Sequence, residues 1–233
     1  MKNIKKKIKR IVYNTRSYWS YDPDHKFHIN NDEVKKYFNT AKTTPLSIES
    51  EKSEEQAIMS LIKIRPGMKI LDLGCGEGRW AKVLKNRDVK YVGVDFSDEL
   101  INKARKKNIE NNVEFISKPA QDFISDYKFD FIFIFGLITY MNDEDIRKLS
   151  RNCRVMLKNG GKLILRDVAL NDEVADRRVY DDKHNLFKKV FFKEPRYQLI
   201  RRSTNIEEKL FKEFSLVHKQ IIDGTNLIIT IFK

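Results

Sequence analysis

The feature that most constrains the fold of this chain is a regular alternation of strand-like and helix-like segments from residue 53 to residue 232. The segment Phe129 to Phe135 is apolar at every position except Asp130, so it does not alternate between polar and apolar residues. Strands of this kind are typical of a parallel sheet that helices cover on both faces. The alternation therefore predicts a doubly wound α/β fold with right-handed crossover connections.

Seven strands are expected, and the last two differ from the others. Residues 215–222 and 226–232 flank Asp223-Gly224, a turn too short for a crossover, so this pair should be antiparallel. The remaining expected strands are residues 68–74, 90–95, 113–118, 129–136 and 162–167. The expected helices between and around them are residues 53–64, 78–87, 97–108, 142–157 and 206–214.

The sequence divides into two parts around residue 48. Residues 1–48, with an amphipathic start and many aromatic residues, are predicted to form a helical cap or lid. The first dozen residues could dock on the body of the protein or lie on an anionic surface. Residues 49–233 form the main domain, with a polar, aromatic and basic insertion at about 168–205. An insertion of this length is usually functional or mobile.

Length and composition exclude several classes of protein. The chain has 233 residues and 41% hydrophobic residues, enough for one sizeable core. No apolar run approaches the roughly 20 residues that cross a bilayer, and no secretory signal is evident, so a cytoplasmic location is expected. The two cysteines, Cys75 and Cys153, fit a reducing compartment. No Cys/His cluster has zinc-ligand spacing, so no metal site is indicated.

A formal net charge of +13 leaves the partner open. Such a charge attracts nucleic acid, anionic lipid or small phosphorylated molecules. Lysine-rich sequences also carry many solvated lysines that have no partner. Charge alone therefore does not identify what the protein binds.

The residues that point to chemistry begin at the end of the first expected strand, in Asp72-Leu-Gly74-Cys75-Gly76-Glu-Gly78. Glycines allow a sharp turn and let a ligand approach the backbone closely. The spacing is G-x-G-x-G, whereas a dinucleotide site requires G-x-G-x-x-G. Asp72 would not help a pyrophosphate, but it would suit a cationic sulfonium cofactor.

This turn resembles the first motif of the class I S-adenosylmethionine (SAM) dependent methyltransferases, over roughly residues 55–167 and the closing strand pair. The resemblance implies that Asp95, which ends the second strand, accepts hydrogen bonds from both ribose hydroxyls. It places Phe96 beside the adenine, with Asp122 as the acceptor for the exocyclic amine. The full set of cofactor residues that the resemblance implies is Asp72, Gly74, Cys75, Gly76, Asp95, Phe96, Gln121, Asp122 and Phe135. The product would be S-adenosylhomocysteine (SAH).

Candidates for catalysis are less well defined. In the family the segment after the fourth strand lies beside the methyl group, so Tyr140 could point at the acceptor or simply pack. This segment lacks the Asn/Asp-Pro-Pro-aromatic signature of enzymes that methylate exocyclic amines of bases. His184, in the insertion, is a candidate general base because an ordinary His pKa lies near neutral pH. A solvated loop histidine is the alternative.

Candidates for acceptor binding come from the cap and the insertion. Tyr18 belongs to the aromatic stretch that could shield the methyl group from water. Arg196, Tyr197, Arg201 and Arg202 form a basic and aromatic group suited to a phosphorylated acceptor. A solvated loop edge would contain the same residue types.

Three functions are compatible with these observations. The first is O- or N-methylation of a small molecule, such as a sugar, a nucleotide-linked intermediate or a phosphate-containing metabolite. The second is methylation of RNA, which the positive charge favours. The third is a cofactor-binding subunit without catalysis. The acceptor, the methylated atom and the oligomeric state do not follow from the sequence.

Overall fold

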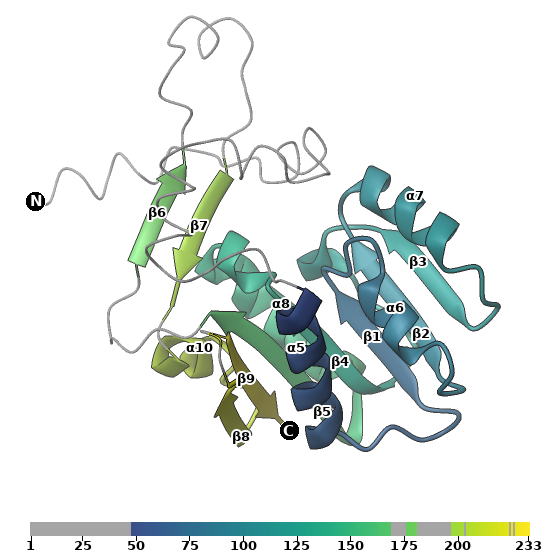
Figure 1. Ribbon diagram of the computed structural model, residues 1–233. Helices are drawn as coiled ribbons and strands as arrows, with labels where there is room; N and C mark the ends of the chain where they lie inside the picture. Colours follow the sequence, from purple (N-terminus) through teal and green to yellow (C-terminus); the bar gives the residue numbers. More distant parts are fainter. Residues whose placement is uncertain (1–47, 169–175, 181–196, 203, 224, 226) are drawn as a thin grey trace, which may run out of the picture.

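The computed structural model describes residues 48–168, 176–180, 197–202, 204–223, 225 and 227–233 (Figure 1). The helices are α5 (Ile48–Leu61), α6 (Arg79–Leu84), α7 (Asp98–Lys107), α8 (Asp143–Met156) and α10 (Thr204–Leu210), with short 3₁₀ helices η1 (Ala120–Asp122) and η2 (Ile138–Tyr140). The strands are β1 (Lys69–Leu73), β2 (Lys90–Asp95), β3 (Val113–Ser117), β4 (Phe129–Phe135), β5 (Leu157–Val168), β6 (Asp176–Tyr180), β7 (Tyr197–Arg201), β8 (Leu216–Ile221) and β9 (Leu227–Phe232).

The main sheet of the described residues has seven strands in the order β3-β2-β1-β4-β5-β9-β8. Strands β1 to β5 are parallel, whereas β9 runs antiparallel to β5 and β8 antiparallel to β9. The doubly wound fold and the antiparallel closing pair predicted from the sequence are thereby confirmed. The order reverses at β1 and β4, and in open α/β sheets ligands bind at the carboxyl ends of the strands on either side of such a switch.

The two faces of the sheet carry separate apolar cores. Helices α5, α6 and α7 cover one face, where Trp80 packs against Phe133 and Phe135 at 5.4 and 5.1 Å between ring centroids. Helices α8 and α10 cover the opposite face, where Phe211 stacks on Phe232 at 5.5 Å. Because strand residues alternate in direction, each strand contributes its even- or odd-numbered side chains to one core.

Polar residues fix where the covering helices begin. Ser97 caps α7 by accepting a hydrogen bond from the Leu100 amide at 3.3 Å. Asn142 caps α8 in the same manner through the Asp145 amide at 2.9 Å. Caps of this kind satisfy backbone donors that the first helical turn leaves unpaired. Both helices therefore start immediately beyond the carboxyl ends of strands, next to the edge where a ligand would lie.

Two regions differ in detail from the sequence-based expectation. Strand β5 begins at Leu157 and includes Gly160-Gly161, which we expected before the strand, with a register shift opposite Phe129 to Phe131. Gly160 has a φ of 79°, which accommodates that irregularity. Within the expected insertion, β6 and β7 form an antiparallel two-stranded ribbon. The predicted cap or lid at residues 1–48 lies outside the described residues, apart from the start of α5.

Candidate functional site

The turn between β1 and α6 is built around three glycines with left-handed backbone conformations. Gly74, Gly76 and Gly78 have φ values of 81°, 54° and 77°. A Cβ at Gly78 would lie 2.7 Å from Phe115 Cζ, so this glycine is required for packing. A Cβ at Gly76 would meet no atom within 4 Å. Among the described residues, Gly76 therefore borders open space, which a ligand can approach closely.

Asp95 faces this turn from the end of β2. Its Oδ2 accepts a hydrogen bond from the Gly76 amide at 3.1 Å, and its Oδ1 accepts one from the Ser97 amide at 2.9 Å. Burial raises the pKa of Asp95, while these backbone hydrogen bonds lower it. Each carboxylate oxygen can accept a second hydrogen bond. A buried carboxylate held in this way is suited to a pair of vicinal hydroxyl groups.

Asp72 lies on β1 beneath the same turn, and its side chain is almost completely buried. The Tyr91 hydroxyl donates a hydrogen bond of 2.5 Å to its Oδ2. Burial raises the pKa of Asp72 to about 7, against the lowering effects of this hydrogen bond and of Arg79. Asp72, which the sequence suggested would suit a cationic ligand, is therefore hydrogen-bonded to Tyr91 and is only partly ionised at neutral pH.

The other expected cofactor residues surround the turn at different depths. Cys75 is buried, and a Cβ at Gly93 would lie 2.9 Å from its sulfur atom. Phe96 and Gln121 are half-buried. Asp122 is exposed, and its Oδ1 accepts from Lys148 Nζ at 2.6 Å. The structure thus places these residues along the carboxyl ends of β1 to β3, and their roles toward a cofactor stay predictions.

Phe135 and Tyr140 lie at the carboxyl end of β4. Phe135 is half-buried and stacks on Phe133 with ring centroids 5.0 Å apart. Tyr140 is half-buried in η2, one short turn beyond the strand. Both therefore occupy the edge where the sheet order reverses, and the proposed role of Tyr140 in catalysis remains a prediction.

Most of the predicted acceptor-binding residues are not described by the structure. Tyr18, His184 and Arg196 lie outside the described residues. For Tyr197 and Arg201 the structure describes only the backbone, at the two ends of β7. Their roles stay predictions.

Arg202 differs from the interpretation of the sequence, which grouped it with acceptor-binding residues. Its side chain is 1% exposed. Its terminal nitrogens donate to the carbonyl oxygens of Ile138 at 2.9 Å and Met141 at 2.8 Å. Asp143 Oδ1 accepts from its Nε at 3.0 Å and from its Nη2 at 2.7 Å. Arg202 thus holds η2 and the start of α8 in place.

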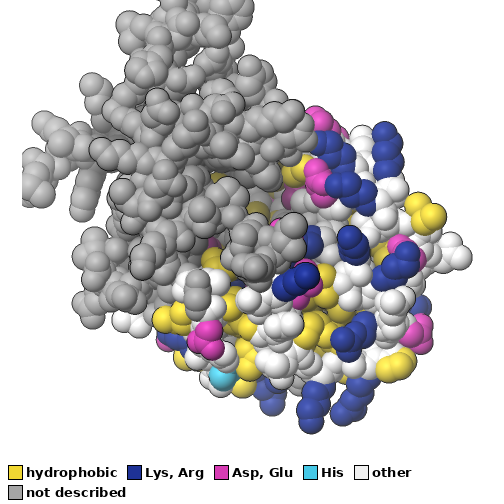
Figure 2. All heavy atoms as spheres, viewed as in Figure 1, with side chains coloured by type: hydrophobic (Ala, Val, Ile, Leu, Met, Phe, Trp, Pro, Cys, Tyr) yellow, Lys and Arg dark blue, Asp and Glu magenta, His cyan; other side chains and the backbone are white. Residues whose placement is uncertain are grey.

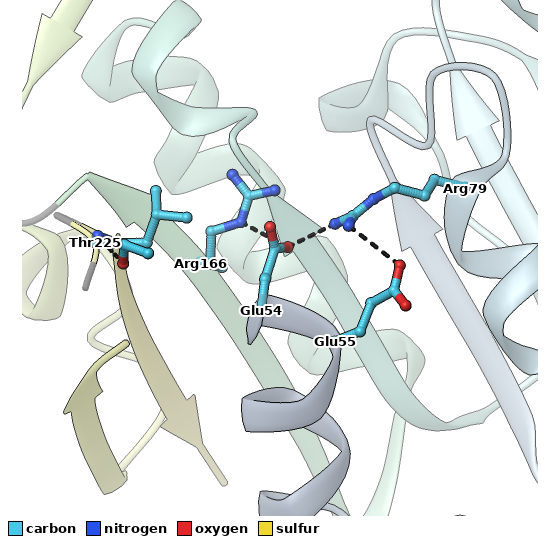
Figure 3. A network of polar contacts seen from close by, with 6 residues as sticks. Glu54, Glu55, Arg79, Arg166 and Thr225 are labelled. Carbon is cyan, nitrogen blue, oxygen red and sulfur yellow. Dashed lines mark hydrogen bonds and ion pairs between the residues drawn. The ribbon is translucent and has the colours of Figure 1, made fainter. Parts of the chain in front are cut away.

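The sequence analysis missed a network of charged residues beside the glycine turn (Figure 3). Glu54, on α5, accepts hydrogen bonds from Arg79 at 2.6 Å and from Arg166 at 3.0 Å. Arg79 opens α6, and Arg166 lies near the end of β5. One signal was available: Arg166 is a charged residue at the end of an otherwise apolar strand segment, Leu163 to Leu165.

None of the helices in the described residues is both long and apolar enough to cross a bilayer. No group of three or more His, Cys, Asp and Glu side chains within the described ranges is arranged to hold a metal ion.

Residues 70–161 match a protein family model described as a methyltransferase domain. Among curated proteins, phosphoethanolamine N-methyltransferase 1 of Triticum aestivum is 27% identical over 153 residues, which are 63% of this chain and 29% of that protein. A ubiquinone biosynthesis O-methyltransferase of Coxiella burnetii is 30% identical over 114 residues, 45% of each chain. This chain therefore spans about a third of the length of the phosphoethanolamine N-methyltransferases that it matches.

Among solved structures, the complex of DhpI with SAH has a TM-score of 0.65 and 18% sequence identity to this chain. The match covers 94% of both chains. At this identity the likeness concerns the fold, and it extends over nearly the whole of both molecules.

Proposed function

We propose that this chain is a class I SAM-dependent methyltransferase that transfers a methyl group from SAM to a small-molecule acceptor. The observation that carries the proposal is the pairing of Gly76, beside open space, with Asp95, whose carboxylate is fixed by two backbone amides. These residues are matched to a ligand that brings a ribose diol close to the backbone.

In this proposal, each part of the cofactor has a group on the chain to hold it. Asp95 accepts from the two ribose hydroxyls, and Phe96 lies beside the adenine. Gln121 and Asp122 line the adenine edge, where Asp122 exchanges its surface ion pair with Lys148 for the exocyclic amine. Gly76 leaves room for the chain that leads to the sulfur atom, and the neighbouring Gly74 packs against Leu137, 3.1 Å from where its Cβ would lie.

When bound, the cofactor supplies an electrophilic methyl group. The protein then has to hold the acceptor in line with that group, at roughly 3–3.5 Å, and to exclude water. Arg202 supports this task because its hydrogen bonds fix the segment from Ile138 to Asp143, which follows the switch strand β4. Tyr140 on that segment is the described residue that we propose to contact the acceptor, with His184 as the candidate base.

The named relatives support a small-molecule acceptor. One is a phosphoethanolamine N-methyltransferase and another is an O-methyltransferase of ubiquinone biosynthesis. We favour a phosphate-containing acceptor for this chain, bound by Arg196, Tyr197 and Arg201 of the insertion. On the described part of the face in Figure 2, the Lys and Arg side chains are scattered among Asp and Glu and do not form one patch, so this face lends no support to the RNA alternative.

The test is to measure SAH formation with purified protein, SAM and three kinds of acceptor. The panel contains phosphoethanolamine, a catechol and total RNA. We expect turnover with a small molecule, and most strongly with phosphoethanolamine. Turnover on RNA alone would overturn the small-molecule proposal. Binding of SAM without turnover on any acceptor would favour a cofactor-binding subunit without catalysis.

A further inference from the structure

Three charged side chains meet where the turn after β1 approaches the end of β5 (Figure 3). Glu54 Oε1 accepts from Arg79 Nη2 at 2.6 Å and from Arg166 Nε at 3.0 Å. The Glu54 side chain is 0% exposed. Burying a carboxylate is costly unless it is paired, and the two guanidinium groups supply that pairing for Glu54.

The two arginines use their nitrogens differently. Arg79 directs Nη2 to Glu54 and Nη1 to Glu55, the latter at 3.5 Å. Arg166 contacts Glu54 only through Nε, and its two terminal nitrogens form no hydrogen bond with a described residue. Figure 3 shows these nitrogens pointing away from Glu54. Because the Arg166 side chain is only 13% exposed, its two terminal nitrogens present N–H donors that are largely shielded from water.

Arg166 also lies against the residues that border the proposed cofactor site. A Cβ at Gly136 would be 3.0 Å from its Nη1, and its guanidinium carbon is 5.7 Å from the centre of the Phe135 ring. Burial is the main influence on the pKa of Asp72, but the charges of Arg79 and Arg166 lower it. The guanidinium therefore lies within electrostatic reach of the acid beneath the glycine turn.

The second carboxylate oxygen of Glu54 also has unused capacity to accept hydrogen bonds. Glu54 Oε2 is buried and accepts no hydrogen bond from a described residue. Buried carboxylate oxygens without a donor are uncommon in native proteins. A guanidinium with two free donors and a carboxylate oxygen with free lone pairs together complement a carboxylate and an ammonium group on one carbon atom. That combination is the α-amino-acid end of SAM and SAH.

We propose that Arg166 binds the carboxylate of the cofactor's amino-acid end, and that Glu54 orients Arg166 and accepts from the adjacent ammonium group. This inference rests on the proposed function, because it assigns the remaining end of the same ligand. We assign no ligand contact to Arg79, because each of its terminal nitrogens already contacts a carboxylate, that of Glu54 or that of Glu55.

Titration calorimetry with two ligands tests the assignment. SAH carries the amino-acid end, whereas 5′-methylthioadenosine has the same nucleoside and sulfur atom without it. In Arg166→Lys, one ammonium group can still reach Glu54 but no longer forms a planar fork. We expect the Kd for SAH to rise by about 10- to 100-fold, as for a lost charge-assisted hydrogen bond, and the Kd for methylthioadenosine to stay within about twofold.

Two further variants distinguish ligand binding from structural support. Arg79→Lys disturbs the same Glu54 oxygen and should change the Kd of both ligands by less than about threefold. Glu54→Gln should weaken SAH selectively, because the amide cannot attract the ammonium group or hold Arg166 by charge. Thermal unfolding of each variant shows whether it is folded under the conditions of titration.

The outcomes are separable. Equal weakening of both ligands in Arg166→Lys would overturn the inference, because it would mean that Arg166 only supports the fold. An unchanged Kd for SAH together with a raised KM for the acceptor would also overturn it, and would assign Arg166 to an anionic group of the acceptor. Wild-type protein that binds neither ligand would contradict the proposed function itself.

Discussion

Each face of the sheet buries an arginine near the end of β4, and the two arginines differ in how fully the protein uses them. Arg202, on the face of α8 and α10, donates to two backbone carbonyl groups and to Asp143. Arg166, on the face of α5 and α6, donates only through Nε. Burial alone therefore does not indicate a role in binding. The number of donors that remain unused separates a structural arginine from a candidate ligand-binding one.

The largest expected effect concerns the buried acids of the two faces, Asp72 and Glu207. Burial raises the pKa of Asp72 to about 7 and that of Glu207 to about 9, the latter also through the charge of Asp167. A raised carboxyl pKa lowers stability as pH rises, because the unfolded chain loses its proton first. The penalty grows between about pH 4 and 7 for Asp72 and between about pH 4.5 and 9 for Glu207.

Neutral substitutions should remove these penalties separately. The free energy of unfolding of Asp72→Asn, compared with that of wild type, should increase by on the order of 3 kcal/mol as the pH rises from 4 to 7. Little further increase is expected above about pH 8. Glu207→Gln should continue to gain up to pH 9. Urea unfolding as a function of pH measures both effects. Identical pH profiles for the two variants would contradict the different pKa values of the two acids in the folded protein.

An intermediate effect is expected from replacing each arginine by lysine. Arg202→Lys should lower the free energy of unfolding by about 2 kcal/mol, because one ammonium group cannot satisfy two buried carbonyl groups and Asp143 together. Arg166→Lys should cost less than about 1 kcal/mol, since only its bond to Glu54 is needed for the fold. Urea unfolding at pH 7 provides the comparison, and equal losses would remove the distinction between the two arginines.

The smallest effect is expected for the two cysteines. Burial raises the pKa of both thiols, so each reacts slowly with iodoacetamide at pH 8. Cys75 lies in the glycine turn, and bound SAH should slow its alkylation by about fivefold through restriction of local opening. Cys153, in α8 on the opposite face, should show the same rate with and without the ligand. Peptide mass spectrometry follows both sites, and equal protection of the two would argue against a localised site.

The parts of the site that were predicted from the sequence depend on local chemistry. The glycine turn and Asp95 were recognisable because a sharp turn and an acid at a strand end have short, fixed spacings. The sequence did not show why residue 78 has to be glycine, because that requirement comes from packing against Phe115 of a different strand. Likewise, the bond between Glu54 and Arg166 joins residues 112 positions apart.

The interpretation of Arg202 shows the opposite error. Its neighbours in the sequence are basic and aromatic, which is the composition of a phosphate site and also of a loop edge. Two of its acceptors are backbone carbonyl groups of Ile138 and Met141, and no residue type encodes such acceptors. The β6–β7 ribbon was missed for a related reason, since its two strands are separated by residues 181–196 and their pairing is not local.

The central claim is that Asp95, together with the open space beside Gly76, binds the ribose of SAM. Its most direct test is titration calorimetry of SAH into wild type, Asp95→Asn and Gly76→Ala. We predict that wild type binds SAH with micromolar affinity. In Asp95→Asn the Kd should rise at least tenfold, because one acceptor oxygen is removed. In Gly76→Ala binding should be lost, because a methyl group enters space that the protein leaves open. Folded variants that bind SAH as tightly as wild type would contradict this placement of the cofactor.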